Sequence, residues 1–88
     1  MIKGKTSTGF EFEINENILN DMEILDLVTE ISEDNMMALS PLINRIMGDQ
    51  KKQLYDHVRE KDGRVPVDKV SSEIVEIFNA CGNAGKNS

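Results

Sequence analysis

The stretch that decides the fold is Gly9-Phe10-Glu11-Phe12-Glu13-Ile14. Its apolar residues alternate with glutamates, so the pattern predicts a β-strand with one buried and one wet face. Residues 2–6 form a second short extended run, and polar Ser7-Thr8-Gly9 separates the two. A glycine at the end of such a loop supplies the positive φ that the turn requires, so we predict a β-hairpin over residues 2–14. Because a two-stranded hairpin is marginal alone, its aromatic face must pack on helices.

Amphipathic helical patterns follow this hairpin. Apolar residues recur at helical spacing within residues 16–34, 36–47, 50–62 and 67–81. The sequence therefore predicts an α+β fold, with an N-terminal β-hairpin packed on a small bundle of about four short helices. We expect residues 1–78 to form one globular domain. Residues 79–88 are rich in Gly, Asn, Ala and Ser and are expected to be a flexible C-terminal tail.

The helical faces that carry Leu39, Leu42, Ile43 and Ile46, and Val70, Ile74 and Ile77, are expected to form the core with Phe10 and Phe12. In the last pattern Val67 and Cys81 share the face of Val70. In the first helical pattern the regular stripe is Ile18, Met22, Leu25, Val28 and Ile31, and Ile24 and Leu27 widen it. Apolar residues outside the stripes are many for so small a domain, and an exposed patch of them would mark a protein interaction site. The candidate partner-binding residues are Ile24, Leu27, Met36, Met37, Val75 and Phe78.

Composition excludes several classes of function. The 88 residues carry a formal net charge of −6, which argues against unaided nucleic-acid binding because that requires clustered Lys and Arg. No apolar run is long enough to cross a membrane, and no signal-peptide pattern follows Met1, so we expect a cytoplasmic protein without a membrane anchor. Residues 1–35 are acidic and residues 45–69 mildly basic, which could steer head-to-tail homo-oligomers. We favour the alternative that these two regions form solvated faces that neutralise each other within the fold.

Catalytic chemistry has few candidate residues. His57, Asp56 and Cys81 are the only ingredients for nucleophilic catalysis, and adjacent residues on a helix point in different directions. The chain also lacks a glycine-rich phosphate loop and a cluster of metal ligands. We therefore expect no enzyme activity, and no catalytic, cofactor-binding or metal site. Ser40 raises an acyl-carrier alternative, but its context is Leu39-Ser40-Pro41, and a helix N-cap explains this serine fully.

A set of short segments, read in order along the chain, resembles a known family. The segments are Ile2-Lys3-Gly4-Lys5, Gly9 to Ile14, Met22-Glu23-Ile24-Leu25-Asp26-Leu27, Glu30-Ile31, Ala38-Leu39-Ser40-Pro41-Leu42-Ile43, Ile46-Met47-Gly48, Gly63-Arg64-Val65-Pro66 and Glu73-Ile74-Val75-Glu76-Ile77-Phe78. Together they resemble the small tail assembly chaperones of long-tailed phages and prophages of Gram-positive bacteria. The resemblance covers nearly the whole chain.

This resemblance implies a protein of the host cytoplasm that is not expected in the mature virion. Its partner would be the tape measure protein, whose hydrophobic helices it would shield from aggregation. A longer form, made by a translational frameshift, would recruit tail tube protein, with residues 79–88 as the connector. The alternative is a small structural protein of the virion, such as a head–tail adaptor, which would stay in the particle.

Overall fold

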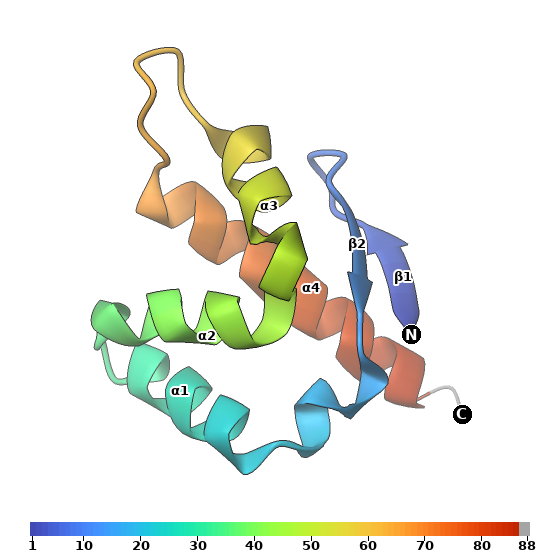
Figure 1. Cartoon of the computed structure of the whole chain (residues 1–88). Coiled ribbons are helices and arrows are strands. Elements are labelled where there is room, and N and C mark those ends of the chain that lie inside the picture. The colour runs from blue at the N-terminus through green and yellow to red at the C-terminus, as the bar shows by residue number, and fades with distance from the viewer. Residues whose placement is uncertain (87–88) are drawn as a thin grey trace.

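The computed structural model describes the backbone of residues 1–86 and the side chains of residues 1–81. A two-stranded antiparallel hairpin precedes a set of helices, which confirms the predicted α+β class (Figure 1). The elements are β1 (Ile2–Lys5), β2 (Glu11–Ile14), the 3-10 helix η1 (Glu16–Asn20), α1 (Met22–Ser32), η2 (Met36–Ala38), α2 (Leu39–Met47), η3 (Gly48–Gln50), α3 (Lys51–Val58) and α4 (Val67–Lys86).

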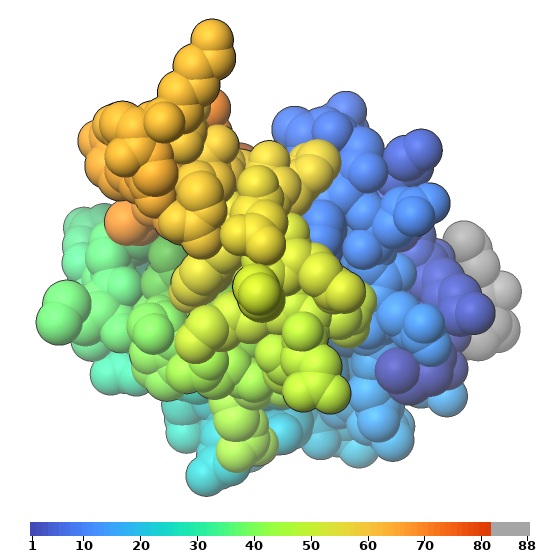
Figure 2. All heavy atoms as spheres, turned by 45° about the horizontal axis from the view of Figure 1, so that its top comes forward, coloured from blue at the N-terminus to red at the C-terminus, as the bar shows by residue number. Residues whose placement is uncertain are grey.

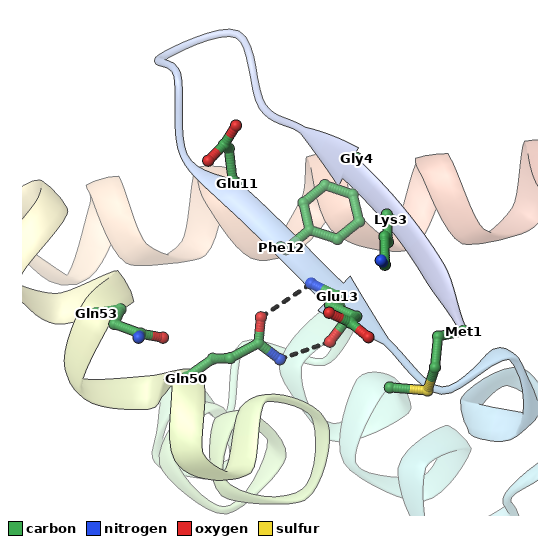
Figure 3. Close-up of a pocket in the computed structure, with 8 residues that line it drawn as sticks. All are labelled: Met1, Lys3, Gly4, Glu11, Phe12, Glu13, Gln50 and Gln53. Carbon is green, nitrogen blue, oxygen red and sulfur yellow. Dashed lines mark hydrogen bonds between the residues drawn. The ribbon is translucent and has the colours of Figure 1, made fainter.

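The hairpin owes its tight packing to a glycine opposite an aromatic ring. Gly4 pairs with Phe12, and the ring of Phe12 lies across it (Figure 3). A Cβ atom on residue 4 would lie only 2.6 Å from Cζ of Phe12, so glycine is required there. Gly9 closes the turn with a φ of +94°, as the loop pattern predicts. The buried residues of β2 are Phe12 and Ile14, and Phe10 precedes them.

The outer edge of β2 is sealed by the side chain of Gln50. The amide of Glu13 donates to Oε1 of Gln50 at 2.8 Å, and Nε2 of Gln50 donates to the carbonyl of Glu13 (Figure 3). At Glu13 the carboxamide thus supplies both hydrogen bonds that an adjacent strand would make there. An open strand edge is a site for unwanted pairing with other chains, so this contact protects the hairpin as well as fixing η3 against it.

Polar contacts fix the start of α1 and its position beside α2. Oδ1 of Asp21 accepts a hydrogen bond from the amide of Glu23 and caps α1. Arg45 of α2 reaches back to Asp21 at 2.7 Å and to Glu23 at 2.8 Å. The hydrogen bond from Arg45 holds the pKa of Asp21 below its usual value. Gly48, with a φ of +49°, then ends α2.

Helix α4 crosses behind α3 and the hairpin and contributes to the core (Figure 1). The space-filling view shows α3 in the middle of one face, with the hairpin on one side and the α1–α2 segment on the other (Figure 2). The buried apolar side chains from the helices are Ile18, Ile24, Ala38, Leu39, Leu42, Ile43, Ile46, Met47, Leu54, Val58, Val70, Ile74, Ile77 and Cys81. The stripes predicted for α2 and α4 are therefore core faces, except at Val67, which is exposed.

In α1 the regular apolar stripe of the sequence is not the most buried face. Ile24 is only 2% exposed, whereas Met22 is 67% exposed and Leu25 is also exposed. Val28 and Ile31 are half-buried against the core. The buried face of α1 is thus centred on Ile24, because that face packs on α2 and η2.

Three boundaries also differ from the predictions. Helix α3 ends at Val58 rather than near residue 62, and Ser40 lies in the first turn of α2, which begins at Leu39. Within the tail expected over 79–88, residues 79–86 are helical, because α4 continues to Lys86. Residues 87–88 lie outside the described part. Within residues 1–86, none of the helices combines the length and the apolar character that crossing a bilayer requires.

Candidate functional site

The hairpin side of α4 is closed by hydrogen bonds to two glutamates. Glu73 is only 2% exposed, and its carboxylate accepts hydrogen bonds from the hydroxyls of Thr6 at 2.8 Å and Thr8 at 2.9 Å. One turn later, Glu76 accepts from both the amide and the hydroxyl of Ser7, each at 2.8 Å. We call these contacts the polar seam. Every oxygen of both carboxylates has a donor here, so the seam holds the hairpin turn on α4.

His57 joins the polar seam, but its geometry does not suit catalysis by Thr8. Nε2 of His57 lies 2.9 Å from Oγ1 of Thr8. The hydroxyl of Thr8 has a single proton and donates it in the hydrogen bond to the carboxylate of Glu73. In the bond between Thr8 and His57, Nε2 of His57 is therefore the donor and Oγ1 of Thr8 the acceptor. A histidine that donates to a hydroxyl is not its general base. Cys81 is buried, and burial raises the pKa of its thiol, which lowers the fraction of reactive thiolate.

The opposite side of α4 is open and apolar. A hollow of about 160 Å³ lies between α1, α2 and α4, and we call it the α1–α4 hollow. Val28 and Ile31 of α1 form one wall, and Val75 and Phe78 of α4 form the other. Its floor is made of the core residues Leu39, Leu42 and Ile74.

The walls of the α1–α4 hollow carry no charge. Besides its apolar residues, the hollow is lined by Ser71 and Asn79 of α4. Val75 is 56% exposed although it stands next to a core residue, so its apolar surface is available to a partner. Such an uncharged, partly exposed wall favours contact with another apolar surface over contact with water or an ion.

A second apolar hollow, of about 220 Å³, lies on the other side of Leu39. It is bounded by Met36 of η2, Tyr55 of α3, Val65 of the segment before α4, and Val67, the first residue of α4. We call it the η2 hollow. Because Leu39 lines both hollows, they are neighbours along one edge of the molecule rather than unrelated surface features.

The candidate binding residues from the sequence fall into three groups. Val75 and Phe78 line the α1–α4 hollow, and Met36 lines the η2 hollow. Met37, the next residue in the chain, is 84% exposed. Leu27 is half-buried against the core and lines neither hollow. Ile24 is buried in the core, which removes it from the candidate surface.

Exposed apolar residues that the sequence analysis missed lie on η1, α1 and the first turn of α4. Leu19, Met22 and Leu25 are exposed, although the last two belong to the regular stripe of the first helical pattern. Val67 is also exposed because it is the first residue of α4 and lies beyond the packed helices. The available signal was the width of the apolar pattern in α1, which is too broad for one buried face.

Comparison with known proteins adds no assignment. No protein-family model, no curated protein and no solved structure gives a significant match to this chain.

Proposed function

We propose that this protein is a phage or prophage tail assembly chaperone that binds the tape measure protein and keeps it soluble. The observation that carries the proposal is the α1–α4 hollow, an uncharged apolar site that is open to a partner on a small acidic domain. The resemblance of the sequence segments to these chaperones supplies the identity of the partner. The role is binding without catalysis, in the host cytoplasm, and the protein is absent from the mature virion.

The size of the hollow suits one large side chain of a helical partner. An apolar cavity of about 150 Å³ can hold a benzene-sized group, and the α1–α4 hollow measures about 160 Å³. An amphipathic helix presents such side chains in a row and binds by laying its apolar face into a groove between other helices. Val75 and Phe78 would contact that face on the α4 side.

Small size and acidic charge also fit a chaperone for a long partner. Many copies of a domain with a net charge of −6 would cover apolar helices and keep the complex soluble by mutual repulsion. Weak contacts repeated along one partner also add up to strong retention when copies associate. In a longer form that recruits tail tube protein, the added segment would continue from the end of α4, which is helical to Lys86.

Co-expression with a tape measure protein tests the proposal. Wild-type protein should keep the tape measure protein soluble, and Val75→Arg should strongly reduce the soluble fraction because it places a charge on the wall of the hollow. Gln53→Arg is the matched control, since it adds the same charge at an exposed position on α3.

Equal solubilisation by wild type and Val75→Arg would contradict the proposed site. No solubilisation by wild type would contradict the function. Finding the protein in purified virions would favour the structural or head–tail adaptor alternative.

A further inference from the structure

Helix α4 presents an uncharged stripe beside the two hollows. Val67, Ser71, Val75 and Phe78 are spaced by four, four and three residues, so they lie along one side of the helix. Val67 and Val75 are 58% and 56% exposed, and the other two are half-buried. Ser71 is a small residue in the middle of the stripe, where a second helix could approach closely.

The two hollows lie at a defined separation along this stripe. Helix α4 contributes Val67 and Val70 to the η2 hollow, and residues from Ser71 to Asn79, centred near Val75, to the α1–α4 hollow. The two sets are centred about seven residues apart, which is about 10 Å along an α-helix. A partner helix lying along α4 would therefore reach both hollows with side chains seven positions apart.

Three exposed acidic residues lie close to this surface in the sequence. Asp68 follows Val67 on α4 and also lines a separate hollow with Arg59 and Lys69, and Glu33 and Asp34 precede η2. None of these three carboxylates takes part in an ion pair among the described residues. A partner with positive charges beside its apolar row would complement them.

We propose that the partner segment is an amphipathic helix with large apolar residues one heptad apart, flanked by Lys or Arg, that packs along Val67, Ser71 and Val75. One large residue enters the η2 hollow and the next enters the α1–α4 hollow. This inference rests on the proposed function and specifies the kind of helix that the site selects. It also assigns Val67 and Met36 to the site together with Val75.

Labelled synthetic helical peptides test the spacing. Each peptide has an alanine-rich helix, flanking lysines and two leucines, placed four, seven or eleven residues apart on one face. The seven-residue spacing should bind at least tenfold more tightly than the other two, measured by fluorescence anisotropy. Replacing its lysines with glutamates should weaken binding at low salt by a similar factor.

Variants of the protein locate the two anchors. Val67→Arg and Val75→Arg should each weaken binding of the seven-residue peptide at least tenfold, whereas Gln53→Arg should have no effect. Both valines are more than half exposed, so unchanged thermal melting should verify that the variants fold.

The outcomes separate this inference from the proposed function. Equal binding of all three spacings, or no peptide binding by a protein that solubilises the tape measure protein, would overturn the heptad inference and leave the chaperone proposal standing. Selective binding of the seven-residue spacing by a protein that fails to solubilise the tape measure protein would support the heptad inference and overturn the proposed function.

Discussion

The two flanks of α4 are built from different chemistry. On the hairpin flank, Glu73 and Glu76 engage the turn through directed hydrogen bonds, and every carboxylate oxygen is occupied. On the α1 flank, Val75 and Phe78 face a hollow with no directed contacts. Directed polar contacts specify one internal partner, whereas apolar surface accepts any partner of suitable shape. Under the proposed function, one helix would separate the contacts that hold the fold together from the contacts with another protein.

Adjacent residues on α4 provide the largest contrast. Ile74 is 4% exposed and Val75 is 56% exposed. Ile74→Ala should lower the free energy of unfolding by about 2–5 kcal/mol, because it leaves a cavity in the core. Val75→Ala should change it by no more than about 0.5 kcal/mol. Denaturant titration measures both, and similar losses for the two variants would mean that the α1 flank is part of the core.

Loss of the polar seam should have an intermediate effect. Glu73→Ala leaves the buried hydroxyl of Thr6 without its acceptor, which costs about 1–3 kcal/mol, and it also removes the part-buried bond from Thr8. Glu76→Ala should cost less, because its bonds to Ser7 are exposed to water, which can replace them. Thermal melting of the two variants checks the order. No loss for Glu73→Ala would show that aromatic packing alone holds the hairpin.

The smallest effect concerns the ion pairs that hold α1, whose stabilisation is lost in acid. Arg45 lowers the pKa of Asp21 in the folded state below the ordinary 3.8, so the folded state binds fewer protons than the unfolded state. The stabilisation is therefore present above about pH 4 and is lost as the pH falls through the lowered pKa.

Asp21→Asn removes this titration and keeps a residue that can cap α1. Its stability should decline less than that of wild type between about pH 5 and pH 2, measured by denaturant titration at each pH. Parallel curves for the two proteins would contradict the assignment.

The flanks also differ in how far sequence alone predicts them. The strict alternation of Phe10, Phe12 and Ile14 with glutamates leaves one possible buried face, so the hairpin is predictable. Helix α1 has apolar residues around most of its circumference, and local spacing cannot choose between the face with Met22 and the face with Ile24. Packing on α2, fixed in part by Arg45, makes that choice.

The candidate site depends even more on tertiary structure. Phe78 and Val75 are recognisable in the sequence as surplus apolar residues, but the α1–α4 hollow exists only because α1 and α4 lie apart on either side of α2. The end of α4 is a second feature that the sequence alone does not predict. Gly82 and Gly85 suggest a loose tail, yet the helix continues to Lys86 beyond the buried Cys81.

Chemical-shift mapping by NMR tests most directly the claim that binding and stability lie on opposite flanks of α4. Isotope-labelled protein would be titrated with the peptide of seven-residue spacing or with a soluble segment of a tape measure protein. We predict that the largest amide shifts occur at Val67, Ser71, Val75 and Phe78, with small shifts at Thr6 to Phe10. Dominant shifts in the hairpin, with little change along α4, would contradict the account.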